Sequence, residues 1–145
     1  MKVIGINGSP RKNGNTSLMI RRVFSELEKE GIQTELYQLG GQLVAGCRAC
    51  RACFDRKNGR CVISNDCINE CIVKMAEAEG IVLGSPTYFA NCSTEMKALI
   101  DRAGYVGKAN GDLYAGKVGA AVSAVRRAGS LPTLDAMNRL LLGAN

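Results

Sequence analysis

Short apolar runs alternate with segments of helical periodicity along most of this chain. The runs occupy residues 2–7, 32–39, 80–88 and 117–125 and are rich in β-branched and other apolar residues. Strands and helices that alternate at this length predict a parallel sheet covered by helices on both faces. Because 145 residues suit one domain and are too few for two, we expect a single α/β domain over residues 1–145.

Four of the intervening segments carry apolar residues at helical spacing, with capping residues at their ends. The expected helix starts are Asn15 or Thr16, Asp66, Ser93 or Thr94, and Ser130, and the first two helices are expected to end at Gly31 and Gly80. Residues 40–66 break the pattern, because periodicity disappears there while glycine, cysteine and basic residues accumulate. A connection of this length predicts a functional insertion.

Charge and composition limit the classes of molecule that this protein is expected to bind. The formal net charge is +6 and histidine is absent, which favours anionic partners such as nucleotides or acidic proteins and removes histidine from any catalytic or ligand role. The chain has no tryptophan and few aromatic residues, so we expect no nucleic-acid binding. The N-terminal apolar run is too short for a signal peptide, and no run approaches a membrane span. A cytoplasmic protein that does not enter membranes is therefore expected.

The turn-rich stretch NGSPRKNGNTS, residues 7–17, follows the first expected strand and leads into a helix. Ligands of parallel sheets bind beyond the carboxyl ends of the strands, where such loops direct backbone N–H groups at an anion. Asn15 stands where a Walker loop needs lysine, and the glycines of this stretch do not match the dinucleotide motif G-x-G-x-x-G. The loop therefore suits a ligand with a single terminal phosphate better than a nucleoside triphosphate or a dinucleotide. The alternative is a flexible turn without a ligand. The predicted phosphate contacts are Ser9, Arg11, Asn15, Thr16 and Ser17.

A second loop, GSPTYFAN at residues 84–91, follows the third strand at the same edge and has the composition to hold a flat ring. Pro86 stiffens the turn, Thr87 can hydrogen-bond to a ring edge, and Tyr88 or Phe89 can lie against a ring face. The alternative is a proline turn whose aromatic side chains fill the core.

A third loop at this edge carries Arg126 and Arg127 after the fourth strand. We expect one of these arginines to stabilise a reduced, anionic flavin or to bind the phosphate of a nicotinamide dinucleotide. The alternative is a solvated basic turn.

Four of the seven cysteines have the spacing C-x2-C-x2-C-x7-C: Cys47, Cys50, Cys53 and Cys61. Three closely spaced thiolates and a fourth after a loop can surround one iron–sulfur cluster, because clusters need soft ligands that converge on a small volume. Structural zinc sites more often use paired C-x-x-C knuckles, and free or redox-active thiols are a further alternative. Nearby arginines and lysines should raise the potential of an anionic cluster and attract an acidic donor such as ferredoxin.

With these segments in view, the chain resembles the NADPH-dependent FMN reductase family, and in particular its iron–sulfur flavoprotein branch. The resemblance spans the chain and is carried by NGSPRKNGNTS, GCRACRACFDRKNGRCVISND, GSPTYFANCSTEMKALIDR and VRRAGS. It implies a flavodoxin-like doubly wound sheet of strand order 2-1-3-4-5, non-covalently bound FMN, and homodimers or homotetramers in which neighbouring subunits complete the flavin site. In that branch the compact cysteine motif binds a [4Fe–4S] cluster.

By this resemblance the phosphate of FMN is assigned to the five residues of the first loop, and the ring contacts to Pro86, Thr87, Tyr88, Phe89 and Asn91. The chain departs from the family where members continue past the helix near Leu140 with a fifth strand and a final helix. We expect the fourth strand to be an exposed edge as a result, either in a truncated product or in a chain whose edge a partner covers.

Together these expectations describe an FMN-dependent oxidoreductase that exchanges electrons with NAD(P)H or ferredoxin and contains a [4Fe–4S] cluster. No side chain is expected to act as a nucleophile, because the flavin carries the chemistry. The alternatives are a cluster-free flavin or quinone reductase, a non-enzymatic electron carrier, and a binding module without a flavin.

Overall fold

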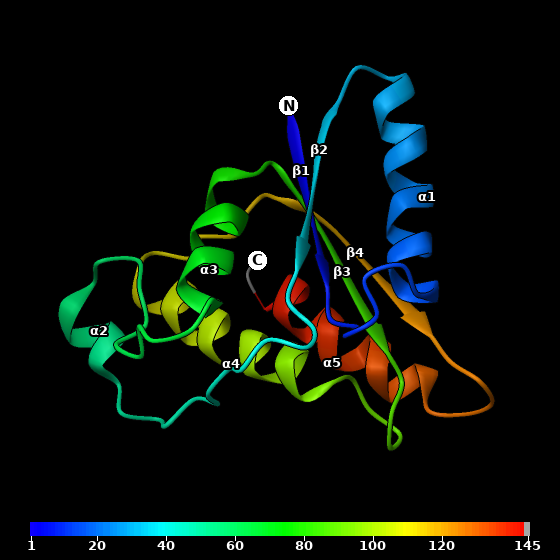
Figure 1. Ribbon diagram of the computed structural model, residues 1–145. Helices are drawn as coiled ribbons and strands as arrows, with labels where there is room; N and C mark the ends of the chain where they lie inside the picture. The colour runs from blue at the N-terminus through cyan, green and yellow to red at the C-terminus, as the bar shows by residue number, and fades with distance from the viewer. Residues whose placement is uncertain (144–145) are drawn as a thin grey trace.

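Four parallel strands form one sheet in the computed structural model, which describes residues 1–143. The strands are β1 (Lys2–Asn7), β2 (Gln33–Gln38), β3 (Gly80–Pro86) and β4 (Val118–Ala124). Their order is β2-β1-β3-β4 (Figure 1), which confirms the predicted flavodoxin-like arrangement. Residues 144 and 145 of the predicted domain lie outside the described residues.

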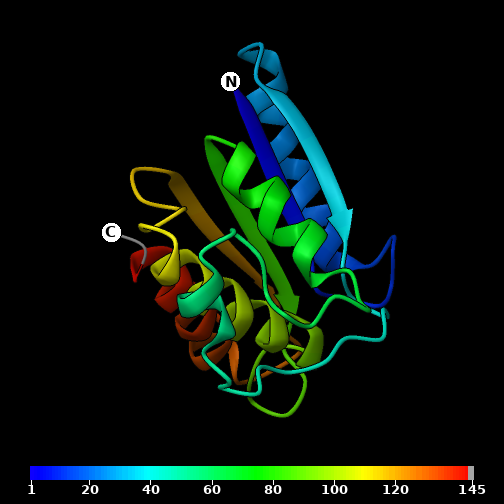
Figure 2. The same cartoon turned by 90° about the vertical axis from the view of Figure 1, so that its left-hand side faces the viewer.

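Five helices are described. They are α1 (Asn15–Lys29), α2 (Ala52–Arg56), α3 (Ile68–Glu77), α4 (Thr94–Ala109) and α5 (Ser130–Leu142). Helix α1 lies on one face of the sheet, whereas α3, α4 and α5 lie on the other, and the short α2 projects beside α4 within the cysteine-rich insertion (Figures 1 and 2). Within residues 1–143, no helix is both long and apolar enough to cross a lipid bilayer.

The central strands alternate their side chains between two cores, as a period of two residues requires. Ile4 and Ile6 belong to the larger core with α3, α4 and α5, whereas Val3 belongs to the smaller core beneath α1. Because a single helix covers the second face, coverage is unequal, and Val118 on β4 is 77% exposed. The fourth strand is thus the exposed edge that the sequence predicts.

Three predicted helix ends need correction. Helix α3 has Cys67 as its N-cap, not Asp66. Helix α1 is capped by Gly14 without any side-chain hydrogen bond, not by Asn15 or Thr16. Helix α3 ends at Glu77, and Gly80 begins β3 instead of ending the helix. A Cβ atom on Gly80 would lie 2.9 Å from Val3 Cγ2, so glycine is needed there for the close approach of β1 and β3.

Other predicted ends are confirmed. Ser93 caps α4, since its Oγ accepts a hydrogen bond from the backbone N–H of Met96 at 3.3 Å. Helix α5 begins at Ser130. Gly31 follows α1 with a φ of +73°, the left-handed conformation that commonly terminates helices.

Candidate functional site

The loops after β1, β3 and β4 leave the sheet at the same edge, and backbone hydrogen bonds join the first two (Figure 1). The N–H of Gly8 donates to the carbonyl of Gly84 at 2.7 Å, and Ser93 Oγ donates to the carbonyl of Gly8 at 2.7 Å. The N–H of Ser93 donates to Ser85 Oγ at 2.9 Å. Loop 8–14 is therefore fixed against the end of β3 and the start of α4.

The loop after β4 is held equally closely to the loop after β3. The backbone N–H of Thr87 donates to the carbonyl of Ala124 at 2.9 Å. Gly129 has a φ of +92°, and a Cβ atom there would lie 2.8 Å from both Thr87 Cγ2 and Ala90 Cα. Only glycine combines this conformation with such an approach. The three predicted ligand loops therefore form one continuous rim.

The first loop brings polar groups to the N-terminus of α1. Ser9, Thr16 and Ser17 are buried, whereas Arg11 and Asn15 are exposed. Ser9 Oγ accepts from the N–H of Arg11 at 3.2 Å, and Ser17 Oγ donates to the carbonyl of Gly14 at 3.0 Å. The absence of a side-chain cap on α1 leaves its first N–H groups to a ligand, and these groups with the helix dipole favour an anion.

The second loop presents its aromatic residues to solvent. Tyr88 is 56% exposed and Phe89 98% exposed, so neither side chain fills the core, and that alternative is wrong. A hydrogen bond of 3.0 Å from the N–H of Tyr88 to the carbonyl of Asn91 closes the turn, and Ala90 takes a φ of +52°. The exposed pair is available to a flat ring or a partner surface.

Thr87 holds the rim together through its hydroxyl. Its Oγ1 lies 3.0 Å from Ser123 Oγ and 2.9 Å from Thr133 Oγ1, which places it between β4 and α5. Arg126 and Arg127 are exposed on the adjoining loop. The rim therefore has a positively charged side next to the aromatic turn.

The cysteine-rich insertion gathers Cys47, Cys50, Cys53 and Cys61 around one small cavity. Three non-glycine residues of the insertion, Ala49, Arg51 and Lys57, have positive φ, so the chain turns tightly there. The four side chains are soft donors of the kind that iron–sulfur clusters require, and this donor set fits such a group. Within residues 1–143, however, no three potential ligands stand at metal-binding separation.

Three of these thiols lie close enough to interact electrostatically. Burial raises the pKa of the Cys53 thiol, and negative charge on Cys61 and Cys50 raises it further. Arg48 and Arg51 line the same cavity, and the Arg51 guanidinium lies 4.9 Å from the ring centroid of Phe54. These cations can offset the negative charge of four thiolates.

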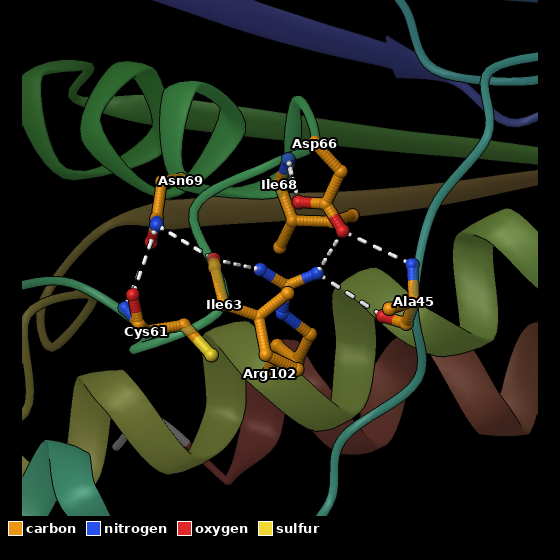
Figure 3. Close-up of polar contacts among 7 residues, drawn as sticks. All are labelled: Ala45, Cys61, Ile63, Asp66, Ile68, Asn69 and Arg102. Atoms are coloured by element: carbon orange, nitrogen blue, oxygen red, sulfur yellow. Dashed lines mark hydrogen bonds and ion pairs between the residues drawn. The ribbon is translucent and has the colours of Figure 1, made fainter.

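Arg102 on α4, which the sequence analysis did not single out, lines this cavity. Figure 3 shows its side chain among Ala45, Cys61, Ile63 and Asp66. The residue is 1% exposed, and its Nη1 pairs with Asp66 Oδ2 at 2.5 Å. Its position three residues after Leu99 and four before Val106 places it on the apolar face of α4. A charged residue at such a position predicts a buried partner, and that signal was present in the sequence.

Asp66 lies one residue before Cys67, the N-cap of α3, and so does not cap the helix as predicted, but it joins several segments. Its Oδ1 accepts from the N–H of Ile68 at 3.1 Å, while its Oδ2 accepts from the N–H of Ala45 at 3.0 Å and from Arg102 (Figure 3). The start of α3 and the beginning of the cysteine-bearing segment are thereby joined at one carboxylate.

The sequence profile of the NADPH-dependent FMN reductase family matches residues 1–144. The chain belongs to this family. An iron–sulfur flavoprotein of Methanocaldococcus jannaschii is 45% identical over 102 residues, which cover 70% of this chain and 51% of that protein. An iron–sulfur flavoprotein of Methanosarcina thermophila is 38% identical over 123 residues, with coverage of 85% and 62%. These relatives support the predicted iron–sulfur flavoprotein branch of the FMN reductase family.

Solved structures agree with this membership at the level of the fold. RosB, determined with the bound intermediate 8-demethyl-8-formylriboflavin-5'-phosphate, superposes with a TM-score of 0.68 at 18% identity, covering 97% of this chain and 60% of RosB. The chain spans about half to three-fifths of the length of the two iron–sulfur flavoproteins above.

Proposed function

We propose that this FMN reductase family member is an FMN-dependent oxidoreductase that exchanges electrons with NAD(P)H or ferredoxin and also holds a [4Fe–4S] cluster. The observation that carries the proposal is the continuous rim made by the loops after β1, β3 and β4, which includes the N-terminus of α1, where no side chain caps the helix. When bound, FMN exchanges hydride or single electrons at its ring, and a cluster exchanges single electrons.

Loop 8–14 and the start of α1 would hold the phosphate. Donors there would be the hydroxyls of Ser9 and Thr16, the side chains of Arg11 and Asn15, and the N–H groups of the first helical turn. The hydroxyl of Ser17 would join them after turning from the carbonyl of Gly14. Fixed donors at a helix N-terminus bind a phosphate dianion without the flexible lysine of a Walker loop.

The second and third loops would hold the ring. Tyr88 and Phe89 offer aromatic faces, while Pro86, Asn91 and the backbone of Thr87 offer a stiff turn with polar groups. The exposed aromatic side chains lose water contact when a ring or a partner subunit covers them, which supports a homodimer or homotetramer. Arg126 or Arg127 would stabilise negative charge on the reduced ring or bind a dinucleotide phosphate.

Cys47, Cys50, Cys53 and Cys61 would hold the cluster, and the surrounding arginines would bind the acidic surface of a donor such as ferredoxin. A second candidate is a cluster-free NAD(P)H-dependent flavin or quinone reductase. It is favoured by one observation, the lack of a preformed ligand set among the described residues. The cytoplasmic location stays a prediction.

Anaerobic purification followed by flavin, iron and sulfide analysis tests both candidates. One FMN and four irons per chain support the iron–sulfur flavoprotein, whereas one FMN without iron supports the cluster-free reductase. Stopped-flow mixing with NADH, NADPH or reduced ferredoxin then identifies the donor. A colourless protein that takes up no added FMN contradicts both candidates.

A further inference from the structure

Arg102 has one buried N–H group without an oxygen partner. Its Nη1 donates to the carbonyl of Ala45 at 3.1 Å and to Asp66, and its Nη2 donates to the carbonyl of Ile63 at 2.7 Å. Its Nε is buried and has no hydrogen-bond partner among the described residues. A buried donor without a partner destabilises the folded state, so such a group calls for an acceptor at this place.

One candidate acceptor is the sulfur of Cys61. Figure 3 shows this sulfur on the side of Cys61 that faces the guanidinium of Arg102. Burial lowers the pKa of Arg102, but its interactions with Asp66 and with the negative charge of Cys61 outweigh this effect, and the pKa lies above its ordinary value. Both residues line the cavity around the four cysteines.

The remaining contacts of Arg102 fix the two ends of the cysteine-bearing segment. Ala45 lies two residues before Cys47, and Ile63 lies two residues after Cys61. The side chain of Asn69 fixes the backbone of Cys61 without involving Arg102. Its Oδ1 accepts from the N–H of Cys61 at 2.7 Å, and its Nδ2 donates to the carbonyl of Cys61 at 2.9 Å. The backbone of Cys61 is therefore held from α3, and its sulfur is directed toward α4.

We propose that Arg102 is a positioning residue for the cysteine-bearing segment and that its Nε–H donates a hydrogen bond to Cys61 Sγ when this sulfur ligates the cluster. The inference rests on the proposed iron–sulfur site and deepens it. A hydrogen bond to a ligand sulfur stabilises the added negative charge of the reduced cluster, so this bond raises the midpoint potential.

Two double variants separate the hydrogen bond from the loss of the ion pair. In Asp66→Asn with Arg102→Gln, the new amide nitrogen stands at the same bond distance from Cα as Nε and can still donate. In Asp66→Asn with Arg102→Met, an apolar group replaces that donor. Both double variants remove one positive and one negative charge, so the net charge near the cluster stays the same as in the wild type.

The readout is the cluster midpoint potential from an EPR-monitored titration of the reconstituted full chain. We expect the Met double variant to shift to a more negative potential and the Gln double variant to stay closer to the wild type. Arg22→Gln, an exposed charge change on α1 at the opposite face of the sheet, serves as a control with little expected shift. Equal potentials for the two double variants would overturn the inference.

A measurement on the wild type covers the case in which the double variants lose the cluster. Pulsed EPR of the reduced cluster in protein labelled with ¹⁵N-arginine should show a ¹⁵N coupling that survives Arg48→Gln and Arg51→Gln. A missing coupling in cluster-loaded protein overturns the hydrogen bond and leaves the proposed function intact. A wild-type protein that binds FMN but no iron instead contradicts the proposed iron–sulfur site, and with it the proposed role of Arg102.

Discussion

Asp66 and Arg102 form an ion pair beneath the cysteine-rich insertion, with side chains that are 3% and 0% exposed. Each partner also satisfies backbone groups: Asp66 accepts from Ala45 and Ile68, and Arg102 donates to Ala45 and Ile63. A charge pair removed from water is held by such additional hydrogen bonds, and removal of one partner leaves the other uncompensated. The pair therefore connects the stability of the fold to the order of the proposed cluster site.

Asp66→Asn should lower the free energy of unfolding by about 3 kcal/mol, because Arg102 is left with an uncompensated buried charge. Asp135→Asn is the matched control, since Asp135 pairs with Arg139 on the surface at 2.9 Å. That exposed pair contributes less than about 1 kcal/mol. Urea denaturation measures the free energy of unfolding of both variants. Equal losses would show that the buried pair stabilises the fold no more than the surface pair.

The same pair predicts an acid-sensitive stability. Burial alone would raise the pKa of Asp66, but hydrogen bonds from Arg102 and from two backbone N–H groups outweigh it and hold the pKa below its ordinary value. A carboxyl with a depressed folded pKa contributes stability above the ordinary value of about 3.9 and loses it as pH falls through the folded pKa. Unfolding free energies measured from pH 5 to pH 2 should therefore fall more steeply for the wild type than for Asp66→Asn. Parallel curves would contradict this role.

The phosphate loop predicts a selective loss of FMN affinity. Thr16→Val removes one buried hydroxyl while keeping the shape of the side chain. A hydrogen bond to a charged group contributes about 1.5–3 kcal/mol, so we expect FMN to bind about ten- to a hundredfold more weakly while riboflavin affinity hardly changes. Thr34→Val on β2 is the control, because Thr34 pairs with Val3 toward the opposite end of the sheet. An equal loss for both flavins would place the phosphate elsewhere.

The aromatic turn predicts a change in binding without a change in stability. Phe89→Ser should leave the unfolding free energy within about 0.5 kcal/mol, because the side chain is 98% exposed. Loss of an aromatic contact should weaken FMN binding about two- to tenfold. Flavin fluorescence titration measures this effect, with Leu43→Ser, at a residue 96% exposed in the insertion, as the control. Unchanged FMN affinity would remove Phe89 from the ring site.

Helix α4 offers a test of the packing. A Cβ atom on Gly104 would meet only Leu140 Cδ1, at 3.6 Å, so Gly104→Ala should stabilise the protein by about 0.5–1 kcal/mol. A Cβ atom on Gly107 would lie 3.0 Å from the ring of Tyr114, and Gly107→Ala should bring no such gain. Thermal unfolding of both variants measures the change in stability. An equal gain at both positions would show that the ring of Tyr114 moves away from the new methyl group without loss of stability.

The positions of the strands could be predicted from short local segments and the start of α4 from its local cap, Ser93, whereas the strand order was implied by the resemblance to the FMN reductase family. The gathering of the three ligand loops followed from parallel topology, since carboxyl ends share one edge. The capping of α1 by Gly14 was not predicted, because Asn15 and Thr16 are better cap formers in isolation. The contacts of Arg102 with Ala45 and Ile63 join positions 57 and 39 residues apart, and local patterns carry no information on such pairings.

Calorimetric titration of the flavin-free full chain with FMN and with riboflavin tests the central claim most directly. If the loops after β1, β3 and β4 hold a phosphorylated flavin, one FMN should bind per chain, and riboflavin should bind at least about a hundredfold more weakly because the donors at the N-terminus of α1 lose their anion. Equal affinity for the two flavins, or no binding of either, would contradict the account.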